Sequence, residues 1–313
     1  MKPPAPPKMV TPRLTGASTT TLRVVDIGVN LTNRAFRSHW KEVVQRSIDA
    51  GVDTLILTGT DLQQSQQCLS MCQEWLDDMV QRTSSDQPVA DDDAAQQSPS
   101  IVAPARTNLY CTIGVHPHDA KTWSEGDDCD AGTKLKELLQ HPLAVAVGEC
   151  GLDYNRNYSS PQQQQLAFRR QLEIACEMNM PVFVHEREAF DDTIRMMDEV
   201  QTRHAALPPV VVHCFTGTEA EAQAYVDRGY YVGFTGTICK AQRGAPLREF
   251  LPRLPLDKIM LETDAPFMGF KKGRKRSEPA DCLDVARRLA EVLDVSVEDV
   301  CAATTRTALG FFR

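Results

Sequence analysis

Short apolar runs recur along the chain from about residue 22 to its end, separated by longer polar and mixed segments. Such nearly continuous runs are typical of parallel strands that are buried on both faces. They predict strands at Leu22–Gly28, Asp53–Thr58, Leu109–Val115, Val145–Glu149, Pro181–His185, Pro209–His213, Tyr230–Thr235 and Lys258–Glu262. The segments between them predict helices at Ser38–Ala50, 61–80 with Asp61 as cap, Gly132–Gln140, Pro161–Asn179, Phe190–Thr202 and Glu219–Gly229, and two more close the chain.

This alternation favours one α/β domain over residues 22–313, a (β/α)8 TIM barrel. A doubly wound sheet fits less well, because no GxGxxG follows the first strand. Residues 1–21 are rich in Pro and Thr and predict a disordered tail rather than a mitochondrial presequence, whose amphipathic helix the prolines would break. Residues 83–105 are polar and acidic, and predict a solvated insertion that loops out of the barrel.

Composition narrows the class of protein without identifying it. The 313 residues are 42% hydrophobic, enough for a full core, and no apolar run approaches the roughly 20 residues of a membrane span. The ten cysteines form no CxxC pair and predict reduced thiols in the cytoplasm or nucleus. A net charge of -8 argues against a generic nucleic-acid coat protein, but it does not exclude an enzyme that holds phosphate with a metal.

Polar side chains follow most of the predicted strands, where the chemistry of such barrels gathers. They are Asp26 and Asn30 after the first strand, His116 and His118 after the third, Glu149 and Asp153 at the fourth, His185 and His213 ending the fifth and sixth, and Asp264 after the eighth. A lone histidine in a strand is more often a core residue. Imidazoles and carboxylates that converge on one barrel mouth are instead the ligands of a divalent ion.

Two pairs of residues at these strand ends, His116 with His118 and Cys150 with Cys214, differ in what the sequence predicts for them. Both His116 and His118 can ligate or contact substrate, and we favour His116, because Gly114 and Val115 deliver it directly from the strand. The thiols of Cys150 and Cys214 are predicted to pack away from the site, since adjacent strand residues point to opposite faces.

Five motifs resemble those of the TatD family of metal-dependent deoxyribonucleases. They are Gly114–His118 (GVHPH), Gly148–Asp153 (GECGLD), Pro181–His185 (PVFVH), His213–Gly217 (HCFTG) and Glu262–Pro266 (ETDAP). The resemblance runs from Asp26 to the C-terminus, apart from the insertion. It implies a metallo-hydrolase TIM barrel that cleaves DNA phosphodiesters, often as a 3′-to-5′ exonuclease.

Matched motif by motif, the resemblance makes Glu149, His185 and His213 metal ligands and Asp264 a ligand or the base that takes the water proton. His116 would contact the scissile phosphate or protonate the leaving group, with His118 and Asp153 also at the substrate. The chain departs from the Asp-x-His-x-His pattern of many relatives, because Gly28 and Asn30 stand in the histidine positions. This puts a two-metal mechanism in doubt, and leaves at most a weak second site at Asp26 and Asn30.

The densest basic cluster, residues 271–276 (KKGRKR), follows the last strand and is called the basic rim below. We expect Lys271, Lys272 and Arg274 to contact substrate phosphates, although a solvated loop or a nuclear localisation patch has the same composition. Imidazole ligands favour Zn or Mn, whereas the resemblance implies Mg, with one or two ions.

The leading interpretation is a monomeric, metal-dependent nuclease that acts on DNA, with no membrane or protein partner. The alternatives are a metal-dependent amidohydrolase or esterase on the same barrel, and a binding or scaffold protein that has lost catalysis.

Overall fold

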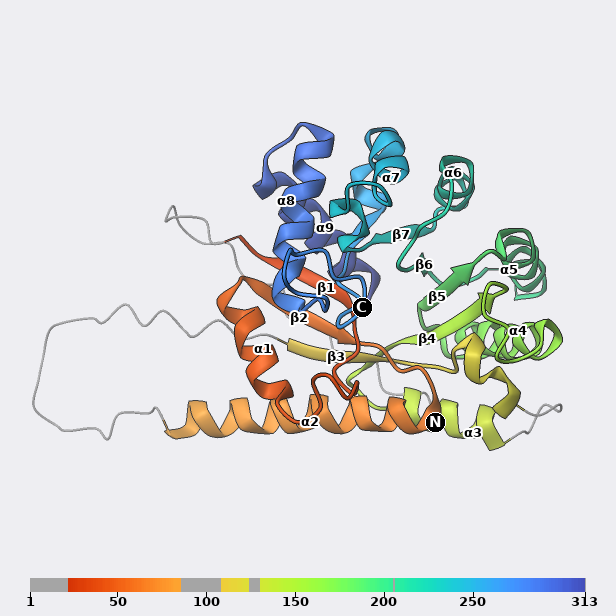
Figure 1. Cartoon of the computed structure of the whole chain (residues 1–313). Coiled ribbons are helices and arrows are strands. Elements are labelled where there is room, and N and C mark those ends of the chain that lie inside the picture. The colour runs from red at the N-terminus through yellow and green to blue at the C-terminus, as the bar shows by residue number, and fades with distance from the viewer. Residues whose placement is uncertain (1–21, 86–107, 124–129, 205, 313) are drawn as a thin grey trace, which may run out of the picture.

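A computed structural model of the chain describes residues 22–85, 108–123, 130–204 and 206–312 (Figure 1). The predicted tail and most of the predicted insertion lie outside these residues. The eight-stranded sheet is parallel throughout, in the order β1-β2-β3-β4-β5-β6-β7-β8. Its strands are β1 Val24–Val29, β2 Val52–Leu57, β3 Asn108–Ile113, β4 Ala144–Asp153, β5 Val182–Arg187, β6 Val210–Val212, β7 Tyr231–Phe234 and β8 Ile259–Leu261.

Helices surround this ring of strands (Figure 1). They are α1 Trp40–Asp49, α2 Leu62–Ser85, α3 Asp130–Leu139, α4 Pro161–Met178, α5 Phe190–His204, α6 Glu219–Asp227, α7 Ala245–Phe250, α8 Cys282–Leu293 and α9 Val297–Phe311, with 3-10 turns η1 Pro117–Thr122, η2 Gly236–Cys239, η3 Leu251–Arg253, η4 Leu256–Lys258 and η5 Pro279–Asp281. A parallel bridge between Val29 and Ala265 brings the end of β1 beside the segment after β8. The predicted (β/α)8 TIM barrel is confirmed.

Two predicted boundaries were wrong. Helix α2 continues through Ser85, so the predicted insertion does not begin at Thr83. Its start is as predicted, because the Asp61 carboxylate accepts the backbone N–H of Gln64 at 2.8 Å. Strand β4 does not end at Glu149 but runs on to Asp153.

The core has an outer and an inner part. The outer part packs the helices against the strands. The inner part fills the barrel with side chains such as Ile27, Ile56, Phe183 and Met260, and the end of α9 closes it with Phe311. Since both faces of the strands are buried, their runs are apolar throughout. Among the described residues, no helix is long and apolar enough to cross a membrane.

Candidate metal centre

Three histidines that end or follow different strands converge on one oxygen of a carboxylate from β4, at the mouth of the barrel, where the C-terminal ends of the strands meet. Glu149 Oε1 lies 2.8 Å from His213 Nε2 and 2.9 Å from His185 Nδ1. Its distance to His116 Nε2 is 3.4 Å. All four residues had been predicted at strand ends, and the structure brings them together.

A β-bulge in β4 aims Glu149 into this cluster. Val147 pairs with Val182 and Cys150 with Val184, so β4 carries one extra residue between the pairs. Such a bulge re-aims a side chain without ending the strand, which explains why β4 continues to Asp153. Gly148 makes the bulge possible, because its φ is 139° and a Cβ there would collide with the backbone oxygen of Phe183.

The cluster fits a divalent metal ion. One ligand atom each from His116, Glu149 and His185 lie within 4.8 Å of one another. Nε2 of His185 is buried and makes no hydrogen bond to the described residues. Its neighbour Asp153 Oδ2 lies 3.4 Å away. Imidazole nitrogens, a carboxylate and an unsatisfied buried nitrogen are the donors that a divalent transition metal takes.

Electrostatics keep the central carboxylate ionised. Burial opposes its charge, but His116, His213 and His185 together hold the pKa of Glu149 well below its usual range. Burial lowers the pKa of His116 to about 4, so this imidazole is neutral near pH 7. Burial also disfavours the charged form of His213, yet Glu149 and Glu262 raise its pKa well above the usual value. The raised pKa of His213 therefore places a positive charge directly beside Glu149 Oε1.

Glu262 fixes the orientation of His213. Its Oε2 lies 3.2 Å from His213 Nδ1, while its other oxygen accepts the backbone N–H of Cys214. An imidazole anchored through Nδ1 presents Nε2 to the site, which is the usual arrangement behind a metal-bound histidine. Glu262 had been assigned no role from sequence, although it opens the ETDAP motif. The signal in the sequence was a carboxylate directly after the apolar run of the last strand, and the structure buries it fully.

The departure at Gly28 has a structural explanation. A Cβ at this position would lie closer than 3.0 Å to Glu262 Oε2 and 3.5 Å from Phe183 Cζ. The Glu262 carboxylate thus fills the space in front of Gly28, and no side chain fits there without moving it.

The other first-strand residues are held by β8 and its loop. Asp26 accepts the N–H of Thr263 at 2.9 Å and its hydroxyl at 2.6 Å, while burial raises the pKa of Asp26 well above its usual value. The Asn30 amide donates to Asp264 Oδ1 at 3.0 Å. A second metal at Asp26 and Asn30 would compete with these hydrogen bonds, and it stays a prediction.

Asp264 has a φ of 51°, in the left-handed region that aspartate tolerates better than most residues. Burial raises its pKa to about 7, and the carboxylates of Glu149 and Glu262 add to this against the opposing charge of His213. Asp264 is therefore coupled electrostatically to this cluster, although, like His213, it is not one of the three residues with mutually close ligand atoms.

A second pair stands beside the cluster. His118 Nε2 lies 2.9 Å from Asp153 Oδ2, and His118 and His116 meet edge to face with ring centroids 4.3 Å apart. Burial opposes ionisation of Asp153, but His185 and His118 hold its pKa well below the usual range. The pair places a polar edge directly next to His116 and His185.

Two buried glutamines of α4 position the loops that carry these side chains. Gln164 accepts the N–H of Asp153 at 2.8 Å and donates to the carbonyls of Asp153 and Ser159. Gln171 bonds both the N–H and the carbonyl of Val115, the residue before His116. In the sequence, the glutamine run at the start of α4, residues 162–165, is typical of a polar helix face. Spacing along the helix gave no sign that the amides point inward at the β4 loop.

The two neighbouring cysteines behave differently. Cys150 is buried, with its sulfur 3.8 Å from the Phe183 carbonyl, as the packing prediction requires. Cys214 lies beyond the end of β6 with a φ of 48°, so strand alternation does not apply to it. Burial raises the pKa of its thiol well above the usual value, and the carboxylates of Asp264, Glu262 and Glu149 add to this effect. The thiol of Cys214 is thus near the carboxylates of the site and not remote from them.

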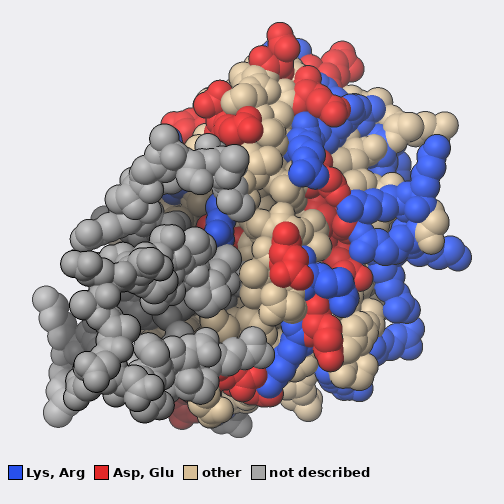
Figure 2. Space-filling model, turned by 90° about the vertical axis from the view of Figure 1, so that its left-hand side faces the viewer, with Lys and Arg blue, Asp and Glu red and all other residues tan. Residues whose placement is uncertain are grey.

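Part of the basic rim is already neutralised by ion pairs. Lys271 lies 2.9 Å from Asp281 and 2.5 Å from Asp284, and Arg274 pairs with Asp281 and, at 3.5 Å, with Glu278. The exposed rim cations for which the described residues provide no ion pair are Lys272, Lys275 and Arg276. Figure 2 shows Lys and Arg side chains gathering along one side of the molecule, whereas Asp and Glu are interspersed elsewhere.

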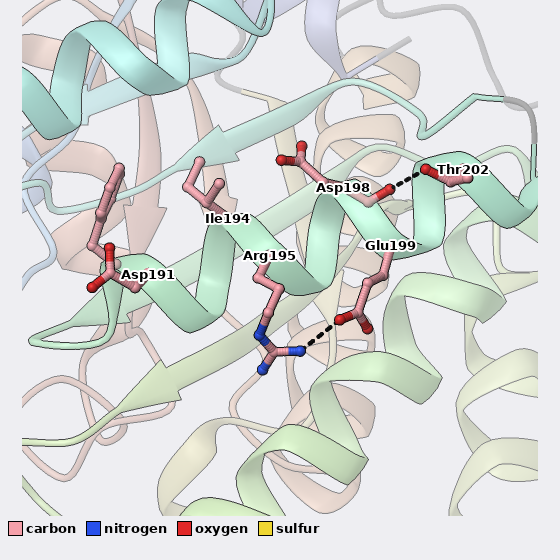
Figure 3. A pocket seen from close by; sticks show the side chains of 7 residues that line it. Asp191, Ile194, Arg195, Asp198, Glu199 and Thr202 are labelled. Atoms are coloured by element: carbon pink, nitrogen blue, oxygen red, sulfur yellow. Dashed lines mark hydrogen bonds and ion pairs between the residues drawn. The ribbon is translucent and has the colours of Figure 1, made fainter.

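A depression on the outer face of α5 carries no comparable chemistry. Its polar lining residues satisfy one another: Arg195 pairs with Glu199 at 2.6 Å, and Thr202 bonds the Asp198 carbonyl at 2.8 Å (Figure 3). We assign no site there.

Imidazoles and carboxylates at the mouth of a (β/α)8 barrel define the class of metal-dependent hydrolases. The chain belongs to the family of TatD-related DNases, whose model matches residues 25–313. It is 39% identical over 270 residues to the 3'-5' ssDNA/RNA exonuclease TatD of Shigella flexneri, covering 85% of this chain and 89% of the relative. It is 38% identical over 270 residues to the exonuclease of the same name in Escherichia coli, covering 85% of this chain and 89% of that relative.

Solved structures confirm the fold. A TatD family hydrolase from Entamoeba histolytica superposes with a TM-score of 0.77 at 20% identity, covering 94% of this chain and 99% of that one. A TatD homologue from Escherichia coli gives 0.74 at 25% identity, with the same coverage. A dihydroorotase from Campylobacter jejuni, with a TM-score of 0.50 and 13% identity, shares the fold alone. The match covers 92% of this chain and 82% of the dihydroorotase. The predicted family and hydrolase class are confirmed.

Proposed function

We propose that this chain is a metal-dependent 3'-5' exonuclease that hydrolyses phosphodiester bonds of single-stranded DNA and RNA. The convergence of His185, His213 and His116 on Glu149 Oε1 carries the proposal. It agrees with the names of the relatives, whose activity extends the predicted DNA substrate to RNA. The amidohydrolase alternative has only fold-level support, from an uncharacterized amidohydrolase of Saccharomyces cerevisiae at 22% identity and TM-score 0.73, and from the dihydroorotase at 13% identity.

His116, Glu149, His185 and His213 would hold the ion. Three imidazole nitrogens with one carboxylate favour Mn or Zn over Mg. When bound, such an ion neutralises phosphate charge and lowers the pKa of a bound water. The roles of the surrounding residues follow from their hydrogen bonds. Glu262 holds His213 through Nδ1 and keeps Nε2 toward the site.

Asp264 accepts the proton of the attacking water on a carboxylate oxygen, while the Asn30 amide, 3.0 Å from Oδ1, fixes the carboxylate plane. The His118–Asp153 pair donates a hydrogen bond to the scissile phosphate or to the leaving oxygen. Asp153 restricts the orientation of the His118 ring.

The exposed rim cations Lys272, Lys275 and Arg276 then contact backbone phosphates. This revises the sequence prediction, which chose Lys271, Lys272 and Arg274. Replacing the three exposed cations with Ala should raise the KM for DNA and flatten its salt dependence, because each neutralised phosphate steepens the salt slope. The pair Lys271→Ala and Arg274→Ala is the matched control, since those charges are held by acidic partners.

The decisive experiment is a nuclease assay on end-labelled single strands. The wild-type protein should shorten 5′-labelled DNA and RNA from the 3′ end with Mn, Zn or Mg, and chelation should stop it. Glu149→Gln, which keeps the size of the side chain but removes its charge, should lower kcat by about 10²- to 10³-fold, a typical loss when transition-state charge stabilisation is removed. Hydrolysis of acyl substrates without nucleic-acid cleavage would instead establish the amidohydrolase alternative. Wild-type activity in Glu149→Gln would refute the assigned centre.

A further inference from the structure

Two aromatic side chains at the mouth are exposed, against the usual preference of aromatic residues for the interior. The exposed fraction is 64% for Tyr158 and 50% for Phe267. They are the only aromatic residues among the large hydrophobic side chains that the described part of the chain leaves exposed. Both belong to loops that follow strands at the catalytic end, Tyr158 after β4 and Phe267 after β8.

Tyr158 lies one side chain away from the metal cluster. Its ring packs edge to face on His118 with ring centroids 4.7 Å apart, and His118 lies against His116. The loop that carries it is well fixed, because the neighbouring Ser159 is buried and bonds the His118 carbonyl at 3.0 Å. Tyr158 therefore presents a free ring face beside the polar edge of the site.

Phe267 is held close to Asp264 by the backbone. Its N–H donates to the Asp264 carbonyl at 2.8 Å, a turn that keeps the two Cα atoms within about 7 Å. Its own carbonyl accepts the hydroxyl of Ser277. Since both backbone groups are bonded, the exposed ring of Phe267 is presented by an ordered loop.

The barrel order places the two rings on opposite sides of the centre. In a closed eight-stranded ring, β4 and β8 stand across from each other. Glu149 enters from β4 and Asp264 follows β8, so each aromatic residue shares its loop or strand with a residue of the centre. A chain lying across the centre would pass one ring before the reacting phosphate and the other after it.

We propose that Tyr158 and Phe267 stack on the nucleobases that flank the scissile phosphate of a single-stranded substrate. This inference rests on the proposed function and supplies a physical basis for single-strand recognition. Base–aromatic stacking contributes about 1–3 kcal/mol per base and tolerates any sequence, since every base has a π-face. In a duplex the bases stack on each other, and their faces are not open to a side chain.

Fluorescence of 2-aminopurine tests the stacking directly. Single strands carrying this base at the 3′-terminal or the penultimate position are titrated with the full-length protein in EDTA, which prevents cleavage. The wild-type protein should quench the fluorescence at both positions. Tyr158→Ala should restore it at one position and Phe267→Ala at the other, and each should raise the Kd by about 5- to 150-fold, the ratio that 1–3 kcal/mol corresponds to.

Three comparisons separate stacking from a structural effect. Tyr158→Phe and Phe267→Trp keep an aromatic face and should retain quenching, whereas Val295→Ala truncates an exposed side chain far along the sequence and should change nothing. On strands with an abasic spacer at the matching position, the alanine variants should bind as the wild type does. A loss of affinity that persists on the abasic strand, or undiminished quenching in both alanine variants, would overturn the proposal.

The wild-type control distinguishes failure of the stacking residues from failure of the proposed function. A wild-type protein that cleaves single strands while the alanine variants match it in KM and quenching refutes the stacking residues alone. A wild-type protein that neither binds nor cleaves single strands refutes the proposed function, and the stacking proposal with it.

Discussion

Gly28→Ala is the substitution for which the structure makes its sharpest prediction. The added Cβ would lie under 3.0 Å from Glu262 Oε2, so the buried carboxylate has to move. Moving it weakens its contact with His213 Nδ1, 3.2 Å away, and its bond from the Cys214 N–H. Hydrogen bonds to a charged group contribute about 1.5–3 kcal/mol each, and overpacking costs about 1–3 kcal/mol. Partial relaxation of the pocket gives an expected loss of about 2–4 kcal/mol.

Urea unfolding followed by circular dichroism measures this loss, and calorimetric titration with Mn measures the second consequence. Metal affinity should fall by about 10- to 100-fold, as for other changes in the residues that orient metal ligands. Gly310→Ala is the matched control, because no heavy atom lies within 4 Å of its added Cβ. It should leave metal affinity unchanged and stabilise α9 by about 0.5–1 kcal/mol.

A double-mutant cycle assigns the effect to the clash with Glu262. In a Glu262→Ala background the obstructing carboxylate is gone, and Gly28→Ala should then cost less than about 0.5 kcal/mol. If Gly28→Ala is as stable as the control and binds metal normally, then Glu262 does not occupy the space in front of Gly28. A steric conflict with that carboxylate would then not account for the glycine.

Three further predictions follow from neighbouring contacts. Gln164→Leu should lower the free energy of unfolding in urea by about 2–4 kcal/mol and should lower kcat, because it leaves the backbone N–H and carbonyl of Asp153 buried without these partners. An unchanged kcat would contradict a role of Gln164 in positioning the β4 loop. Burial raises the pKa of Asp284, but Lys271 and Arg287 bring it below its usual value. This carboxylate therefore stabilises the fold above its unfolded pKa of about 3.9, and it loses that contribution as the pH falls through the folded pKa. Asp284→Asn should lower the free energy of unfolding by about 0.5–1 kcal/mol at pH 7 and should not change it near pH 2. Chelation should abolish nuclease activity but leave the far-ultraviolet circular dichroism unchanged, because the barrel core lies below the mouth.

Sequence alone determined the barrel and most of the histidine and glutamate cluster at its mouth. Apolar runs report burial on both faces, and their regular alternation with helical segments leaves few topologies. Once the strands are parallel and closed into a ring, their C-terminal ends must meet. Histidines and carboxylates at those ends, such as Glu149, His185 and His213, are then brought together by geometry that the sequence implies.

Tertiary structure decided the contacts between residues distant in sequence. The bulge that turns Glu149 inward, the inward-facing amide of Gln164 and the ion pairs that neutralise Lys271 depend on register and helix rotation. A hydrophobic pattern does not define the strand register or the rotation of a helix to within one residue. The same holds for Gly28, which in sequence is a missing ligand. In the fold it is the space that the Glu262 carboxylate needs in order to hold His213, because two side chains cannot occupy one volume in a packed barrel.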